Sequence, residues 1–578
     1  MIAYLVLLSI VVLLGLLIHA KWSPTILFTV WAGGLFLLGL TNEKTVLASY
    51  SNSALVTLIV LILVSLALER LSMLDRLADA LLKGRPAFAV VRFSGMAVLM
   101  SAFVNNTAVV AGFLSVVTRQ RHLPASKLLI PLSIASILGG VTTLIGTSTN
   151  LVVNSFAVNA GLPAIGMFQF SWVGIPVALA CTVVLAFSAR LLPANESTNN
   201  ENSQSYFLEA RIAPGSPLVG KSIEENHMRR LDGLFLVEIE RAGRLISPAG
   251  PNEILQEEDV LIFSGEISKV QALQKFPGLE VFGNQADLLL GSNLVEVVIS
   301  NESELAGQTL RDVDFRTMFD AGVVGIRRGD KRITGQLGRV TLRVGDSLLL
   351  AVGPDFVNHR NIDRNFHVLD GTLLRPKLSR YQSMITLCGF GGAIACSAME
   401  VWPLLNGLIA LLAVLIATKI LSLAELRRRF PFDLLMIIGS ALVIAEVLES
   451  SGAAKILSDG MRAIFDGYGV MGAFVGVYLI TLVLTEMVTN NAAAAFAFPV
   501  ALSTAKAFDV DPTPFIMAVA YGASAGFLIP SGYQTHLMVY SPGRYRLMDY
   551  VRAGLPISIV YSIVVLLLVP VFFPFGGK

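Results

Sequence analysis

The sequence predicts a polytopic α-helical membrane protein that is built as an inverted repeat and carries a polar α/β insert between its two halves. Hydrophobic residues make up 54% and charged residues 15% of the 578 positions, with a mean hydropathy of +0.69, which is too apolar for an ordinary soluble protein. Two Asn-containing motifs recur in corresponding places of the apolar parts, at 103–108 and 487–492, and residues 193–380 between these parts are polar. We expect the membrane halves to span 1–192 and 381–578.

A spanning helix needs about 20 mostly apolar residues. Two apolar stretches, 88–117 and 472–502, have polar clusters in their middle and are expected to form re-entrant hairpins. The segments 128–157 and 515–540 contain Gly or Pro at their centres and are expected to form broken helices. Full or nearly full spans are expected at 2–20, 24–40, 54–71, 128–157, 173–192, 384–399, 402–418, 434–448, 515–540 and 553–573.

The placement of basic residues predicts the orientation. Lys and Arg gather around 70–92, 119–127, 377–380, 419–429 and 544–552. Because such residues concentrate on the cytoplasmic side of a membrane, both termini are expected outside and the insert 193–380 in the cytoplasm. This orientation is consistent only if each hairpin enters and leaves the membrane on the same side. The first hairpin must then enter from the cytoplasm and the second from outside. A bacterial-type inner membrane, crossed many times, is the expected location.

The two halves share more than their hydropathy. The motif FVNNTA at 103–108 matches MVTNNA at 487–492, and LIGTSTNLV at 144–152 aligns with LIPSGYQTHLM at 528–538. The segments occur in the same order but in opposite membrane orientation. Inverted repeats with interrupted helices are typical of secondary transporters, whose sites lie at the repeat interface.

The residue types in these motifs suit ions. Breaks at Gly139, Gly140 and Gly146, or at Pro530 and Gly532, free backbone carbonyls that can coordinate a cation such as sodium. Helix N-termini favour an anion, and Asn, Ser and Thr offer oxygens to a cation and donors to an anion. Neither motif contains Lys or Arg, so bound cations would help to hold the anion. Simple cross-linking of helices by hydrogen bonds is the alternative.

These motifs resemble the divalent anion:sodium symporter (DASS, solute carrier 13-type) family, across both membrane halves. The resemblance implies two sodium sites flanking one anion. It implies a first sodium site at Ser101, Asn105, Asn106 and Gly146, and a second at Thr485, Val488, Asn490 and Gly532. The implied substrate contacts are Asn105, Asn106, Thr107, Thr147, Thr489, Asn490, Asn491 and Tyr533. A homodimer is also implied.

The sequence departs from the dicarboxylate transporters of this family at both hairpin tips. They have Ser-Asn-Thr, whereas this chain has Asn-Asn-Thr at 105–107 and Thr-Asn-Asn at 489–491. It resembles the branch that carries cytosolic regulatory domains, which implies a sodium-coupled importer of a small divalent oxyanion, with sulfate as the expected substrate, working by alternating access. Alternatives are a sodium/dicarboxylate symporter of the same fold, a gated ion channel, or a cation antiporter using Glu486.

Two residues beside these motifs allow two interpretations each. Glu486 is expected to act as a structural acceptor for the second hairpin or, alternatively, to carry protons. His536 is expected to cap a backbone group or to supply a titratable donor. No HExxH motif or paired carboxylates lie at membrane depth, so we do not expect an enzyme.

The insert contains its own repeat after a polar linker at 193–206. Residues 216–223 match 303–310, and 259–263 match 346–350. The two copies, 207–285 and 286–380, resemble tandem TrkA-C (RCK C-terminal) domains, which implies either a regulatory site for an adenine nucleotide or a structural, dimerising role. The net charge of +2 provides no footprint for nucleic acid, and the three cysteines lack metal-site spacing.

Overall fold

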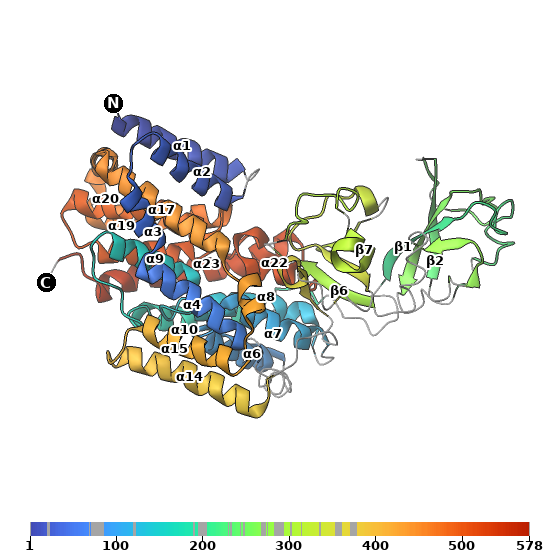
Figure 1. Cartoon of the computed structure of the whole chain (residues 1–578), viewed down its shortest axis with the longest axis horizontal. Coiled ribbons are helices and arrows are strands. Elements are labelled where there is room, and N and C mark those ends of the chain that lie inside the picture. Colours follow the sequence, from blue (N-terminus) through green and yellow to red (C-terminus); the bar gives the residue numbers. More distant parts are fainter. Residues whose placement is uncertain are drawn as a thin grey trace.

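The computed structural model describes residues 2–19, 23–68, 70, 86–119, 123–188, 191–194, 205–228, 231, 234–242, 244–246, 249–266, 273, 275–281, 294–300, 303–313, 315–333, 337–352, 356, 361–369 and 378–576. Most of the predicted linker, the predicted boundary between the insert domains, and basic residues predicted on the cytoplasmic side at 71–85 lie outside these ranges. The described chain forms a helical region, made by the segments before and after the insert, and two β-sheet domains formed by the insert (Figure 1).

The described residues before the insert form ten helical elements, more than the five continuous spans predicted there, because polar and Gly-rich breaks divide the apolar segments. They are α1 (Ile2–His19), α2 (Pro24–Leu37), α3 (Glu43–Tyr50), α4 (Ser53–Leu68), α6 (Pro86–Ser101), α7 (Asn106–Arg119), η1 (Ala125–Lys127), α8 (Leu129–Gly140), α9 (Ser148–Asn159) and α10 (Ser171–Ser188).

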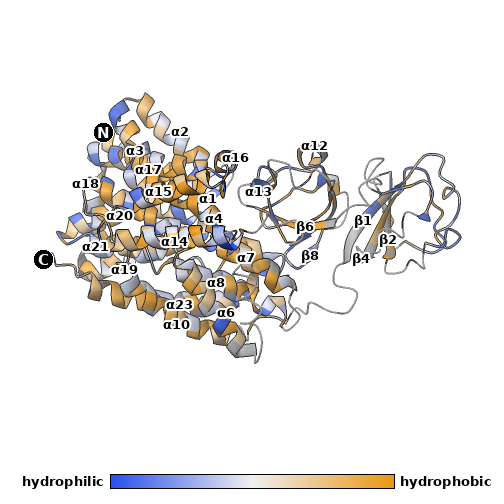
Figure 2. Ribbon diagram, turned by 60° about the horizontal axis from the view of Figure 1, so that its bottom comes forward, coloured by the Kyte–Doolittle hydropathy of each residue, from blue (hydrophilic) through white to orange (hydrophobic). Residues whose placement is uncertain are grey.

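The second half has a related order of helices. They are α14 (Arg380–Ala398), α15 (Leu404–Ala417), α16 (Leu423–Arg428), α17 (Phe432–Ser450), α18 (Ala453–Phe465), η6 (Asp466–Tyr468), α19 (Gly469–Met487), α20 (Asn490–Phe508), α21 (Thr513–Ala523), η7 (Pro530–Gly532), α22 (Gln534–Tyr540) and α23 (Leu547–Phe572). Apolar residues predominate over both sets of helices (Figure 2).

Some helices are long and apolar enough to cross a membrane, whereas other predicted spans are divided into two helices. Within the described residues, four helical stretches are long and apolar enough to cross a membrane: Glu43–Leu68, Ser171–Ser188, Gly469–Met487 and Leu547–Phe572. Three of them match the predicted spans at 54–71, 173–192 and 553–573, whereas Gly469–Met487 belongs to the predicted hairpin 472–502. The spans predicted at 128–157 and 515–540 are each divided, into α8 and α9 and into α21 and α22. Their breaks fall at 141–147 and 524–533, where Gly, Thr, Ser and Pro replace helix-forming residues.

The helices of the two halves interdigitate at these breaks. Helix α9 packs against α20 and α21, whereas α22 packs against α7 and α8. Each broken helix therefore contacts the helix that follows the Asn motif of the other half. A shared core of buried apolar side chains runs through both halves.

The insert forms two antiparallel five-stranded sheets. The first contains β1 (Ser205–Ile212), β2 (Leu234–Arg241), β3 (Arg244–Ile246), β4 (Val260–Glu266) and β5 (Leu279–Val281). The second contains β6 (Leu294–Ile299), β7 (Ala321–Arg328), β8 (Lys331–Arg332), β9 (Ser347–Val352) and β10 (Phe366–Val368), with the short helical elements α12 (Phe315–Phe319), η3 (Leu337–Arg339) and α13 (Ile362–Asn365). Their strand orders, β3-β2-β4-β1-β5 and β10-β6-β9-β7-β8, are the same topology read from opposite edges.

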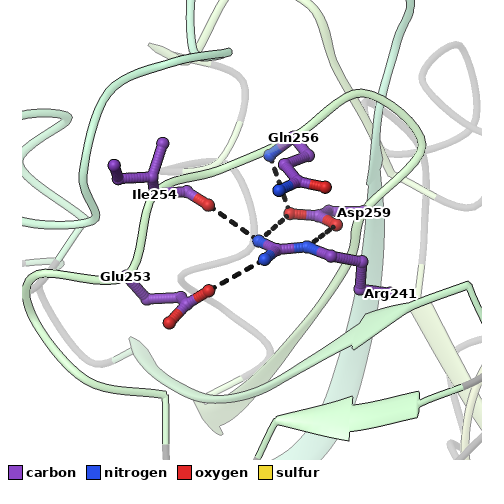
Figure 3. Close-up of polar contacts among 5 residues, drawn as sticks. All are labelled: Arg241, Glu253, Ile254, Gln256 and Asp259. Carbon is purple, nitrogen blue, oxygen red and sulfur yellow. Dashed lines mark hydrogen bonds and ion pairs between the residues drawn. The ribbon is translucent and has the colours of Figure 1, made fainter.

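A bidentate Arg–Asp ion pair, which we call the Arg–Asp brace, occupies equivalent positions in both sheets. The Arg241 guanidinium binds Asp259 with Nε–Oδ1 and Nη2–Oδ2 distances of 2.8 and 2.9 Å (Figure 3). Arg328 binds Asp346 in the same bidentate way, at 2.7 Å for both contacts. Both pairs are 18 positions apart in sequence, and both aspartates are buried. The sheets therefore share side-chain bonding as well as topology.

The chain ends and the insert lie at opposite ends of the helical region. Both termini are at the end farthest from the sheets in two views (Figures 1 and 2). Strand β1 packs against β7, so the two sheets contact each other, and the second sheet lies next to α22.

Candidate functional site

Both Asn motifs stand at breaks between consecutive helices. Helix α6 ends at Ser101 and α7 begins at Asn106; α19 ends at Met487 and α20 begins at Asn490. Thr489 caps α20 by accepting a hydrogen bond from the Ala492 amide at 3.4 Å. The first backbone N–H groups of α7 and α20 lack partners within their helices and attract negative charge. Each motif therefore joins an anion-favouring helix end to side-chain oxygens.

The first motif is packed against the first broken helix. The Ser101 hydroxyl donates to Asn106 Oδ1 at 2.7 Å, and both residues are buried. A Cβ on Gly140 would lie only 2.4 Å from that same Oδ1, and one on Gly146 would lie 2.9 Å from the Ser101 carbonyl oxygen. Glycine at these two positions lets the broken helix come this close to the motif.

The second motif repeats this arrangement. The Thr485 hydroxyl lies 3.3 Å from Asn490 Oδ1, with the same separation of five positions as in the first pair, and donates more closely to the Ala523 carbonyl at 2.6 Å. Gly532 lies against this segment, since a Cβ there would be 3.7 Å from the Thr485 carbonyl oxygen. Three residues predicted for the second sodium site, Thr485, Asn490 and Gly532, thus lie together.

Among the described residues, several hydrogen bonds cross between the halves at this place, and four of them involve the motifs or the breaks next to them. Asn106 Nδ2 donates to the Tyr533 hydroxyl at 2.8 Å, and Thr147 Oγ1 lies 3.2 Å from that hydroxyl. Thr107 Oγ1 donates to Gln534 Oε1 at 3.0 Å. The fourth bond, from Ser148 Oγ to Asn491 Oδ1, is 3.2 Å long.

The remaining predicted residues occupy the same breaks. Asn105 Oδ1 accepts from the Thr107 amide at 3.1 Å, which turns the chain into α7. Val488 caps the end of α19, with its amide bonded to the Leu484 carbonyl. Thr489 is exposed at the tip. These three residues lie in the two turns between helices, where their described contacts are with nearby backbone groups.

The sequence prediction did not include Ser148 and Gln534 among the site residues. Each directly follows a predicted residue, Thr147 or Tyr533, and each bonds to the motif of the opposite half. Their shared place in the two aligned motifs is the signal that could have identified them.

Glu486 and His536 both bond to backbone groups. Glu486 accepts from the Leu528 and Ile529 amides at 2.9 and 3.2 Å, as expected of a structural acceptor. His536 Nε2 lies 3.0 Å from the Gly526 carbonyl oxygen, and its Nδ1 lies 2.7 Å from Ser133 Oγ. Its contact with a carbonyl matches the capping interpretation.

The oxygens at the site suit a hard monovalent cation better than a transition metal. The described part of the chain has no group of three or more His, Cys, Asp or Glu residues placed to hold a metal. Among the described residues, buried Thr149 Oγ1 and Asn150 Oδ1 have no hydrogen-bond partner, which leaves neutral oxygens beside the first break. The residues at the first break therefore fit sodium as a transported ion.

Comparison with known proteins gives a consistent assignment. A family model described as a citrate transporter (CitMHS) matches residues 4–522. An uncharacterized transporter of Synechocystis sp. is 30% identical over 564 residues, which cover 93% of this chain and 91% of that protein. An uncharacterized transporter of Escherichia coli is 27% identical over 512 residues, covering 82% and 83%.

A sodium/sulfate cotransporter of Chlamydomonas reinhardtii is also similar. It is 28% identical over 378 residues, which cover 63% of this chain and 43% of the cotransporter. Because the family model covers most of the sequence, the chain belongs to the CitMHS/DASS-type family of multi-pass membrane transporters, which is not a family of enzymes.

Proposed function

We propose that the protein imports a small divalent oxyanion, sulfate, by sodium-coupled secondary transport with alternating access. The observation that carries this proposal is the pairing of Ser101 with Asn106 and of Thr485 with Asn490, on either side of the Tyr533 hydroxyl. Two similar oxygen clusters can take two cations, and the anion would lie between them. The relatives described as sodium/sulfate cotransporters support both the ion and the substrate.

Charge compensation explains why coupling would be obligatory. The residues named in the two clusters are neutral, so a divalent anion would have no fixed positive side chain beside it. Two bound sodium ions would supply that charge, together with the N-termini of α7 and α20. The anion would then bind weakly without sodium, and sodium would bind weakly without the anion.

The orientation proposed for this importer has both termini outside and the insert in the cytoplasm. Its support is the location of both chain ends at the end of the helical region opposite the sheets (Figure 1). In this orientation the insert would regulate the site from the cytoplasm.

Uptake by purified protein in proteoliposomes tests the proposal. Labelled sulfate should accumulate only with an inward sodium gradient, and Thr485→Val should raise the sodium concentration for half-maximal uptake by roughly tenfold, since one hydroxyl contact is lost. Thr504→Val is the matched control, because that buried hydroxyl bonds only to the Val500 carbonyl within α20. Sulfate uptake that is indifferent to sodium would refute the coupling.

A sodium-coupled carboxylate transporter is the second candidate, because the matching family model is described as a citrate transporter. Excess citrate or succinate distinguishes the two. Under the sulfate proposal neither competes appreciably with labelled sulfate, whereas strong competition together with uptake of the labelled carboxylate favours the second candidate.

A further inference from the structure

The second sheet of the insert holds the end of the broken helix α22. The turn between β7 and β8 contains Gly329 and Asp330, and the turn before β9 contains Gly345. The Gly329 amide donates to Ser541 Oγ at 3.2 Å, and the Ser541 hydroxyl donates to the Gly345 carbonyl. One buried hydroxyl therefore links both turns to the residue that follows α22.

We propose that these two turns, which we call the clasp (Gly329, Asp330 and Gly345), position α22 and thereby control the anion site from the insert. This inference rests on the proposed function for the identity of the transported anion. It assigns to Ser541 the role of a positioning residue, which acts on the site through α22.

Close packing makes the clasp specific for this helix. A Cβ on Gly329 would lie 2.8 Å from the Tyr540 ring, and a Cβ on Gly345 would lie 3.4 Å from Leu537. Both glycines have positive φ angles, of 58° and 83°. The two glycines fit against side chains of α22 because they carry none of their own.

An ion pair extends the clasp onto the next helix. Arg546 Nε lies 2.9 Å from Asp330 Oδ2, and Arg546 is the N-cap residue of α23. The Arg546 side chain is 75% exposed, so this ion pair contributes little binding energy. Its main effect is to orient the start of α23 relative to the turn that contains Asp330. The clasp therefore holds the whole connection between α22 and α23.

The Arg–Asp brace makes the clasp a rigid unit. Arg328 immediately precedes Gly329, and its partner Asp346 immediately follows Gly345. The bidentate contact ties the two turns to each other before they contact α22. The equivalent Arg241–Asp259 brace of the first sheet is shown in Figure 3. In sequence it is flanked by Ala242 and Glu258, which, unlike glycine, carry side chains.

The other end of α22 carries the site. Tyr533 caps the helix and bonds Asn106, and Gln534, its first residue, bonds Thr107. The helix is only seven residues long, from Gln534 to Tyr540. A displacement of α22 at the clasp would therefore shift Tyr533 and Gln534 relative to the first Asn motif, which is how the insert would change anion affinity.

The test uses the full chain in proteoliposomes and in nanodiscs. Gly329→Ala should press a methyl group into the Tyr540 ring, which packs against Tyr550 with ring centroids 6.0 Å apart and has limited room to move aside. We expect faster hydrogen exchange over 533–541 and a KM for sulfate raised by roughly tenfold, with a smaller change in kcat. Ser541→Ala, which removes both hydrogen bonds without adding volume, should change the same quantities in the same direction.

Gly307→Ala is the matched control. Gly307 lies in the same insert domain with a φ of 86°, and a Cβ there would contact nothing within 4 Å. Unchanged hydrogen exchange over 533–541 in both Gly329→Ala and Ser541→Ala would overturn the proposal. Equal effects of Gly307→Ala and Gly329→Ala would also overturn it, as would faster exchange with an unchanged KM for sulfate. If the wild-type protein fails to transport sulfate, the proposed function is wrong, and the exchange measurement alone still decides whether the clasp positions α22.

Discussion

The hydroxyl of Tyr533 is a group through which the two halves meet at the site. It accepts from Asn106 Nδ2 and lies within hydrogen-bond distance of Thr147 Oγ1. Tyr533→Phe keeps the ring but leaves the buried Asn106 amide without this acceptor, a loss of about 1–2 kcal/mol. We expect the variant to fold and its KM for sulfate to rise about tenfold in proteoliposome uptake.

Tyr478→Phe is a suitable control for that variant. The Tyr478 hydroxyl is also in the helical region and lies 2.9 Å from Ser562 Oγ, in a contact between α19 and α23. Its removal should change thermal stability without changing the KM. Equal effects of the two substitutions on KM would show that Tyr533 has no special relation to the anion.

At the scale of single residues, sequence could predict the site only one half at a time. The residues of the pairs Ser101–Asn106 and Thr485–Asn490 are only five positions apart, and the family resemblance implied them. The bond from Thr107 to Gln534 joins positions 427 apart. Such a contact depends on how whole helices pack, and no local pattern specifies it.

The close approach of α8 to the first Asn motif is a property of the helices as elements. A Cβ on Gly140 would come within 2.4 Å of Asn106 Oδ1 and 2.9 Å of its Nδ2. Gly140→Ala should therefore displace the Asn106 side chain or separate the helices, and we expect sulfate uptake to fall by at least tenfold.

Gly34→Ala gives the corresponding control in α2. A Cβ there meets nothing within 4 Å, and alanine favours a helix over glycine by about 1 kcal/mol. Uptake by this variant should match the wild type, with an equal or higher melting temperature. Normal uptake by Gly140→Ala would mean that the observed distance between α8 and Asn106 is unnecessary for transport.

The sequence predicted the helices where an apolar segment contains Gly or Pro at its centre. The interruptions of 128–157 and 515–540 were expected from Gly and Pro and are present in the structure. Helix α18 was not expected as an element, because Lys455, Asp459 and Arg462 within it lower the hydropathy that marks a span. Helix α3 was missed for a similar reason, since it begins with Glu43 and Lys44. A search for membrane spans by hydropathy alone misses charged helices that pack only one face against the protein.

At the scale of the whole molecule, a chain of contacts runs from the first sheet to the second and on to α22. Strand β1 packs against β7, and Leu349 of the second sheet belongs to the apolar core of the first. The repeat in the insert was visible in sequence, but the contact between its copies was not, because it joins β1 and β7, which occupy different places in the two sheets.

Glu209 makes this interface sensitive to pH. It lies on β1, and its carboxylate accepts from the Leu337 amide at 3.4 Å. Burial is the main cause that raises the pKa of Glu209 to about 7, and Glu240 nearby raises it further, whereas the Leu337 hydrogen bond opposes the rise. The folded protein thus keeps a proton that the unfolded chain, with an ordinary Glu pKa, releases at lower pH. The stability of the packed sheets should accordingly fall as pH rises from about 4.5 through 7.

Glu209→Gln should remove this dependence, because the amide stays neutral and its oxygen can still accept from Leu337. We expect the variant to exceed the wild type in stability by about 2 kcal/mol at pH 8 and to differ little at pH 4.5. Protection factors of the β1 amides in the full chain, which correct for intrinsic exchange rates, measure this difference. Glu225→Gln is a control of opposite sign, since hydrogen bonds from Ser222 lower the pKa of Glu225 and the substitution should destabilise the domain above that pKa. A Glu209→Gln variant that is no more stable than the wild type at pH 8 would show that Glu209 carries its charge at the interface without cost.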